Sequence, residues 1–187
     1  MNKTVVLILI FTVRLLAISL LFLVNPITAI VINIITDYAD GPLYKHYLKT
    51  SALRAQYYDK ILDYLYYIGL LFLAFSHLTT VIPLLLLLFV YRTIGEAVFY
   101  ATGNKRVFVY FPNFFEYFTL GFFILKAIDP VVITTSLNWI AILFLVITWF
   151  RVWNESFLHK DNKTFFKVFW LPLFRRLGLG FANKIYE

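Results

Sequence analysis

Four aspartates stand close together, between positions 37 and 63, in a chain of 187 residues that contains only ten acidic residues. They form two pairs, Asp37 with Asp40 and Asp59 with Asp63, and spacings of three and four residues place each pair on one face of a helix. Carboxylate oxygens are the ligands that hard divalent cations such as Mg²⁺, Mn²⁺ or Ca²⁺ prefer. Four carboxylates are enough for a two-metal site, whose usual chemistry is displacement at phosphorus.

The same four residues also permit a structural interpretation, a network of ion pairs at a membrane interface. Carboxylates without partners would repel one another and be costly to desolvate, so cations must lie close to them. The nearest cations along the chain are Lys45, Lys49, Arg54 and Lys60. We favour metal binding, because ionisable groups at membrane depth usually serve a function.

The elements that position these carboxylates are predicted to be membrane helices. The chain is 61% hydrophobic and 14% charged, so a soluble domain of this size would lack the polar surface to cover itself. The fold class that we predict is an all-α integral membrane protein, a bundle of six transmembrane helices. Their expected bounds are about 4–24, 26–45, 59–76, 80–101, 107–127 and 130–150, with Asn25-Pro26 and Asp129-Pro130 marking two helix starts.

Lysine and arginine are distributed unevenly over the predicted connections. The connections at 25–26, 77–79 and 127–129 contain neither residue, whereas the opposite side holds nearly all of the cations. The positive-inside rule then places both termini and the aspartates on the cytoplasmic side, in a polar cavity between the second and third helices. We expect a plasma (inner) membrane location. A net charge of +7 suits lipid headgroups or phosphates and gives no basis for a nucleic-acid partner.

The chain is predicted to divide into a transmembrane catalytic domain, 1–154, and a basic, aromatic tail, 155–187. Aromatic residues alternate with cations at 165–176, and this apolar stretch is too short to span a bilayer. Such a pattern is typical of a segment that lies in the membrane interface. Cysteine is absent from the whole chain, which excludes disulfides and thiolate chemistry.

Two segments resemble a known signature. Ile-Thr-Asp-Tyr-Ala-Asp-Gly at 35–41 and Tyr-Asp-Lys-Ile-Leu-Asp at 58–63 are similar to D-x-x-D-G-x-x-A-R and G-x-x-x-D-x-x-x-D of the CDP-alcohol phosphotransferases. Residues 11–16 also resemble the opening helix of that family, and the six-span plan agrees with it. The chain departs from the signature where Tyr44-Lys45 replaces Ala-Arg and Ala55 replaces glycine.

The resemblance implies an enzyme of phospholipid biosynthesis similar to phosphatidylglycerophosphate synthase. Such an enzyme transfers a phosphatidyl group from a CDP-linked lipid, CDP-diacylglycerol, to an alcohol and releases CMP, and the resemblance further implies a homodimer. The implied ligands of two Mg²⁺ or Mn²⁺ ions are Asp37, Asp40, Asp59 and Asp63, of which Asp63 would also act as base toward the acceptor hydroxyl. The implied nucleotide-binding residues are Gly41, Tyr44, Lys45 and Ala55.

Three further cations favour an anionic acceptor. Lys105 and Arg106 lie in the loop after the predicted fourth span, on the side of the aspartates, and Arg92 lies near the same end. Together they would suit an anionic acceptor such as glycerol 3-phosphate or an inositol phosphate. The resemblance to the family makes glycerol 3-phosphate our preferred acceptor. Each can equally be a topology residue that contacts lipid headgroups. Glu96, one helical turn from Arg92, is expected to form a local ion pair with it, and Glu116 is expected near the membrane interface.

Two other classes of function remain open. The replacement of Ala-Arg and glycine in the signature favours a non-catalytic membrane subunit that keeps the fold for lipid binding or assembly. The carboxylate cluster alone would also suit an ion transporter, although neither inverted repeats nor broken midplane helices are visible in the sequence. Metal-dependent nucleotide binding would favour the enzyme, and metal binding without nucleotide would favour the transporter.

Overall fold

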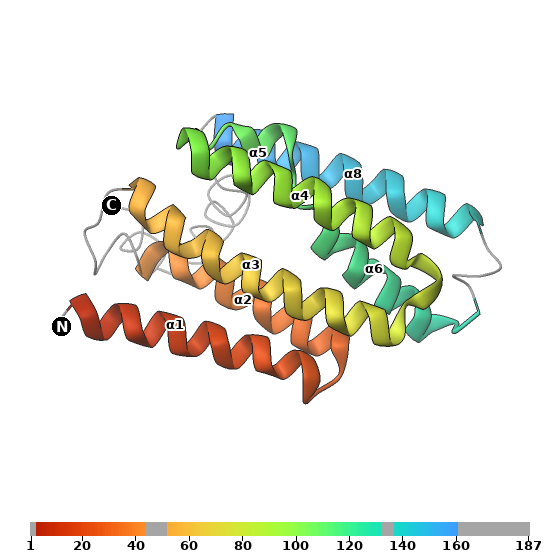
Figure 1. The fold of residues 1–187 in the computed structure, drawn as a ribbon. Helices are drawn as coiled ribbons and strands as arrows, with labels where there is room; N and C mark the ends of the chain where they lie inside the picture. Colours follow the sequence, from red (N-terminus) through yellow and green to blue (C-terminus); the bar gives the residue numbers. More distant parts are fainter. Residues whose placement is uncertain (1–2, 44–51, 132–136, 161–187) are drawn as a thin grey trace, which may run out of the picture.

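The computed structural model describes residues 3–43, 52–131 and 137–160, and these residues form helices with no strand among them. The long helices run roughly along one axis (Figure 1), with the red to yellow helices α1, α2 and α3 on one side of the bundle and α4, α6 and α8 on the other. The all-helical class that we predicted is therefore confirmed for the described part of the chain. Residues 155–160 continue α8, and the rest of the predicted tail lies outside the described residues.

The first two helices meet at the predicted break. Helix α1 covers Lys3–Ser19 and is followed by a 3₁₀ turn, Leu20–Phe22, whereas α2 covers Pro26–Leu43. Proline suits the first turn of a helix because its missing N–H would have no partner there. The side chain of Asn25 accepts a hydrogen bond from the backbone N–H of Ile27 at 3.0 Å. This cap turns the chain back, so that α2 packs against α1.

The third and fourth helices form a second hairpin. Helix α3 covers Ala52–His77, and α4 covers Ile82–Thr102 after a 3₁₀ turn, Thr79–Val81. Lys126 donates a hydrogen bond to the carbonyl of His77 at 2.6 Å, which satisfies an acceptor at the C-terminal end of α3. Gly103 ends α4 in the left-handed region, with φ of 66°, where a side chain would be strained.

The predicted fifth span at 107–127 is not one helix. The structure divides it into a short helix α5, Val107–Tyr110, and a longer helix α6, Phe114–Ile128. Pro112 stands in the break, since proline lacks an N–H and clashes with the preceding turn. Asn113 caps α6 by accepting a hydrogen bond from the N–H of Glu116.

The last described helix, α8, covers Leu137–Lys160. Our prediction started this helix at Pro130, but the structure places Pro130 in a turn, where the side chain of Asp129 accepts a hydrogen bond from the N–H of Val131 at 2.9 Å. Residues 132–136 lie outside the described residues. Helix α8 packs against α5 and α6 and so closes one side of the bundle.

Apolar side chains fill the interior where α3, α4 and α6 meet. Phe115, Phe118 and Phe122 are fully buried, and their spacing of three and four residues places them on one face of α6. Gly95 lets α4 approach the chain at Phe111 so closely that an added Cβ would overlap that side chain. Packing of this density fixes how the polar side chains of neighbouring helices are aligned.

Large apolar residues cover the outside of the bundle while charged residues lie inside. Leu16, Phe72, Leu87 and Trp149 are each more than 60% exposed, whereas Arg14, Asp63 and Glu96 are each less than 5% exposed. Two described helices are long and apolar enough to cross a membrane, Thr4–Phe22 and Thr79–Thr102. These features suggest that the protein associates with a membrane. The six-span arrangement stays a prediction.

Candidate metal centre

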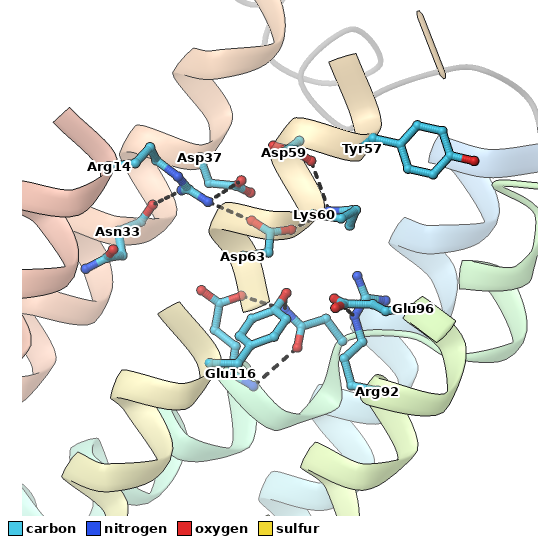
Figure 2. Close-up of polar contacts among 12 residues, drawn as sticks. Arg14, Asn33, Asp37, Tyr57, Asp59, Lys60, Asp63, Arg92, Glu96 and Glu116 are labelled. Atoms are coloured by element: carbon cyan, nitrogen blue, oxygen red, sulfur yellow. Dashed lines mark hydrogen bonds and ion pairs between the residues drawn. The ribbon is translucent and has the colours of Figure 1, made fainter. Parts of the chain in front are cut away.

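Three of the four aspartates come together between α2 and α3. Asp37 of α2 and Asp59 and Asp63 of α3 each present a carboxylate oxygen, and these oxygens lie within 4.8 Å of one another. The side chains point toward a common centre (Figure 2). The predicted approach of the two pairs is therefore confirmed for these three residues. Asp40 lies on α2, but its side chain is outside the described residues.

Arg14 of α1 is the cation that holds two of these carboxylates. Its Nη2 atom lies 2.6 Å from Asp63 Oδ1 and 3.2 Å from Asp37 Oδ1, and its Nη1 donates to the carbonyl of Asn33 at 3.3 Å. Arg14 is only 1% exposed. Arg14 was not among the predicted partners of the aspartates. The available signal was that it is the single charged residue in the apolar stretch 4–36.

Lys60 of α3 is the second cation of the centre, as predicted. Its Nζ lies 3.0 Å from Asp59 Oδ2 and also contacts Asp63 Oδ2. The two oxygens of Asp63 are thus divided between two cations, with Oδ1 bound to Arg14 and Oδ2 bound to Lys60. Of the other predicted partners, Lys45 and Lys49 and the side chain of Arg54 are outside the described residues.

Mutual repulsion is the physical reason that the carboxylates need these cations. Two unit charges 4 Å apart interact by about 4 kcal/mol at the effective dielectric constant of a protein. Three carboxylates within 4.8 Å would therefore destabilise the bundle strongly if nothing opposed them. Arg14 and Lys60 supply two positive charges in direct contact with them. The structure therefore contains the ion pairs that the structural interpretation requires. It also contains the cluster of oxygen ligands that the metal-binding interpretation requires.

A small polar cavity continues from the aspartates into the bundle. Asn33 anchors it, because the side-chain amide of Asn33 donates to the carbonyls of Ala17 at 2.8 Å and Ala29 at 2.9 Å and so links α1 to α2. Its side-chain oxygen and the hydroxyl of Tyr66 are buried without a hydrogen-bond partner among the described residues. The residues that line the cavity are Arg14, Asn33, Asp37, Asp63, Tyr66, Tyr67 and Glu116.

Glu116 lies deep inside the bundle, not near an interface as we expected. The side-chain amide of Asn113 donates to Glu116 Oε2 and to the hydroxyl oxygen of Tyr67, both at 2.8 Å. Glu116 is 9% exposed and belongs to the lining of the same cavity as Asp63. The expectation was based on the nearness of Glu116 to Pro112, but Glu116 is the third residue of α6 and its side chain is buried.

Arg92 and Glu96 form the predicted ion pair within α4, with Nε of Arg92 3.3 Å from Oε1 of Glu96. Arg92 also donates to the carbonyl of Phe111 at 2.8 Å, and its guanidinium lies 4.4 Å from the ring centroid of Phe108. The expected acceptor cations therefore differ in their environment. Arg92 is buried, Lys105 is half-buried in the turn after α4, and Arg106 is exposed.

The predicted nucleotide-binding residues lie at the margins of the described structure. Gly41 belongs to the last turn of α2 and Ala55 to the first turn of α3, so both are close in sequence to the aspartates. The side-chain environment of these two positions is outside the described residues, and so are Tyr44 and Lys45.

Comparison with known proteins adds no relative. No protein-family model, no curated protein and no solved structure matches this chain. The resemblance in the segments 35–41 and 58–63 therefore stays a prediction from the sequence.

The arrangement fits a hard divalent cation better than a soft one. Its described donors are carboxylate oxygens, without histidine or cysteine in the cluster. Mg²⁺ and Mn²⁺ prefer such oxygen ligands, whereas Zn²⁺ sites usually contain nitrogen or sulfur. Asp37 and the pair Asp59 and Asp63 come from two different helices, so an ion bound there would connect α2 to α3.

Proposed function

We propose that this protein is a membrane enzyme that uses a divalent metal to transfer a phosphatidyl group from a CDP-linked lipid to an alcohol. The observation that carries the proposal is the convergence of Asp37, Asp59 and Asp63 from two helices into one cluster. These are three of the four residues that the signature resemblance implies as metal ligands. The buried charges and the apolar exterior support an active site within a membrane bundle.

The proposed ligands of two Mg²⁺ or Mn²⁺ ions are Asp37, Asp40, Asp59 and Asp63. When bound, such ions neutralise the pyrophosphate of the donor and stabilise the leaving CMP. The chain itself supplies the base: Asp63 accepts the proton of the acceptor hydroxyl. The acceptor oxygen forms a bond to the phosphorus of the phosphatidyl group, and the bond from that phosphorus to CMP breaks. Arg14 fixes the orientation of Asp63 through Oδ1.

The donor and acceptor pockets are proposed from the same resemblance. Gly41, Tyr44, Lys45 and Ala55 line the nucleotide pocket, and the preferred acceptor is glycerol 3-phosphate. Lys105 and Arg106 contact its phosphate from the turn between α4 and α5. Arg92 is the third proposed acceptor cation, and inside the bundle it contacts Glu96 and donates to the carbonyl of Phe111, just after α5.

The test is CMP release by the purified protein in detergent with CDP-diacylglycerol, Mn²⁺ and a panel of acceptors: glycerol 3-phosphate, inositol phosphate, serine and choline. We expect CMP release with an anionic acceptor. We expect Asp63→Asn to lower the rate at least about 100-fold, because it removes the base. The matched control is Asp129→Asn, an exposed carboxylate at the opposite end of the bundle, which should retain the wild-type rate. A folded Asp63→Asn protein with full activity would exclude the assigned base.

A second candidate function has one specific observation in its favour. Arg14 and Lys60 already compensate much of the carboxylate charge, as a purely structural network would require. In that case the protein is a non-catalytic membrane subunit for lipid binding or assembly. Calorimetry with CDP and Mn²⁺ separates the candidates, since the enzyme binds the nucleotide in a metal-dependent way and the structural subunit does not. Metal binding without nucleotide would instead indicate an ion transporter.

A further inference from the structure

Both carboxylate oxygens of Asp63 are in contact with cations in the described structure. Arg14 occupies Oδ1 and Lys60 occupies Oδ2. Lys60 also lies 3.0 Å from Asp59 Oδ2, so its ammonium is placed between two of the proposed metal ligands. A metal ion that coordinates Asp63 would lie beside these cations and be repelled by them, and the repulsion is relieved when one of them moves away.

Arg14 is the cation that we expect to keep its contacts with the aspartates when a metal ion binds. It is 1% exposed and makes contacts with Asp63, Asp37 and the carbonyl of Asn33, which connect α1 to both neighbouring helices. A planar guanidinium with several donors is held in one orientation by such a set of acceptors. Breaking these contacts would leave a buried charge without compensation, which is strongly unfavourable.

Lys60 is the cation that can leave. Its side chain is 14% exposed, and its ammonium ends a flexible chain of four carbons. The Nζ atom already lies 5.6 Å from the ring centroid of Phe108, within the distance at which an aromatic face attracts a cation. The guanidinium of Arg92 lies 4.4 Å from the same centroid, so partial exposure and flexibility, and not this ring, are what allow Lys60 to leave.

We infer that Lys60 is an exchangeable counterion of this centre. Its ammonium forms ion pairs with Asp59 and Asp63 in the metal-free protein and is displaced when a divalent ion binds. The displaced ammonium then points to the anionic phosphates of the donor, the ligand class for which a lysine beside this site is suited. The inference rests on the proposed function, because it concerns the same metal ligands. It adds that metal binding to this chain is opposed by one of its own residues.

The first experiment measures the affinity for Mn²⁺ alone in the full-length protein in detergent micelles, by the electron paramagnetic resonance signal of the free ion. Lys60→Gln removes the competing charge, so we expect its Kd for Mn²⁺ to fall at least about tenfold. Lys105→Gln removes the same charge from the turn between α4 and α5 and should change Kd by less than about twofold, because more distant charges are screened. An unchanged or weaker affinity in Lys60→Gln, or an equal gain in Lys105→Gln, overturns the inference.

The second experiment uses the wild-type protein and so does not depend on the folding of a variant. An amine-acetylating reagent is applied with and without saturating Mn²⁺, and modification of each lysine is quantified by mass spectrometry. We expect Mn²⁺ to increase the acetylation of Lys60 several-fold and to leave that of Lys105 unchanged. Acetylation of Lys60 that stays constant or falls on addition of Mn²⁺ overturns the inference.

The outcomes distinguish this inference from the proposed function. If wild-type protein and Lys60→Gln bind Mn²⁺ with equal affinity, the exchange of Lys60 is excluded while the metal-dependent function stands. If neither protein binds Mn²⁺, the metal-dependent function is excluded, and the exchange of Lys60 is excluded with it.

Discussion

Single residues decide how a concentrated negative charge is tolerated inside this bundle. Arg14 contacts the carboxylates of both Asp37 and Asp63 and is almost fully buried. Its removal would leave the buried Asp63 and the partly exposed Asp37 with one cation fewer. A buried pair is costly to break from one side, because the remaining charge keeps its desolvation penalty and loses its attraction.

We therefore predict that Arg14→Gln lowers the free energy of unfolding by about 3–5 kcal/mol. Unfolding is followed by circular dichroism in mixed micelles with increasing sodium dodecyl sulfate. The control is Arg106→Gln, which removes the same charge from an exposed position and should change the free energy of unfolding by less than about 1 kcal/mol. An Arg14→Gln protein as stable as the wild type would show that the aspartates are compensated by other groups.

The affinity for Mn²⁺ should also distinguish the role of Arg14 from that of Lys60. Arg14 neutralises the cluster but does not stand between the carboxylates and a metal in our proposal, whereas Lys60 does. The two cations are thus expected to differ: loss of Lys60 strengthens Mn²⁺ binding, and loss of Arg14 mainly destabilises the fold. This contrast follows from burial and side-chain flexibility, because both residues carry the same charge.

At the scale of elements, the break between α5 and α6 determines which polar groups of this segment lie in the interior of the bundle. Pro112 and the cap formed by Asn113 start α6 at Phe114, and this start places Glu116 in the cavity shared with Asp63. The chain at Phe111 can approach α4 only because residue 95 is glycine. The carbonyl of Phe111 in turn accepts the hydrogen bond of Arg92. Packing at Gly95 is therefore linked to the position of a buried arginine.

We predict that Gly95→Ala lowers the free energy of unfolding by about 1–3 kcal/mol, the usual range for an overpacked core. An added Cβ would overlap the Cβ of Phe111, which cannot move without its backbone. Gly69→Ala is the matched control, since its added Cβ would meet the end of the Leu21 side chain, Cδ1, at 3.2 Å and would otherwise make only ordinary contacts, from 3.5 Å, with Ile18 and Phe22. Sodium dodecyl sulfate titration of both variants checks this, and equal losses would contradict the proposed close contact.

At the scale of the whole molecule, the ends of the bundle differ in chemistry. The start of α1, the end of α2 and the start of α3 lie at one end of the bundle (Figure 1). Asp37 belongs to the half of α2 nearer this end, and Asp59 and Asp63 to the half of α3 nearer it. The connection between α3 and α4 lies at the opposite end and is free of lysine and arginine at 77–79. By the positive-inside rule we propose that the first end faces the cytoplasm, with the active site.

Because the chain has no cysteine, this orientation is testable with single introduced thiols. We predict that Thr50→Cys, in the basic connection before α3, reacts with a membrane-impermeant maleimide only from the cytoplasmic side. Thr79→Cys, at an exposed position between α3 and α4, should react only from the other side. Labelling of position 50 exclusively from outside would reverse the proposed topology, and labelling of both positions from one side would contradict a membrane-spanning α3.

Much of the local structure could be predicted from the sequence. Proline and asparagine chemistry located the start of α2 at Pro26, because the consequences of a missing N–H and of a side-chain cap are local. The spacing of Asp37, Asp59 and Asp63 predicted that they share a centre, since helix periodicity and a hairpin suffice to bring them together. Pro112 also breaks a helix, so the prediction of one helix at 107–127 was wrong.

Tertiary structure alone decided which groups surround the aspartates. Arg14 is 49 residues from Asp63 in the chain, and Asn113 is 46 residues from Tyr67, yet both pairs are in contact. Composition and periodicity show which face of a helix is polar, but not how far two packed helices are shifted along their axes relative to each other. That alignment is set by the packing of side chains such as Phe111 against Gly95, where a single methyl group is enough to change it. The sequence by itself determined most of the helices, the acidic cluster and its neighbour Lys60, and packing added Arg14 as a counterion and formed the cavity.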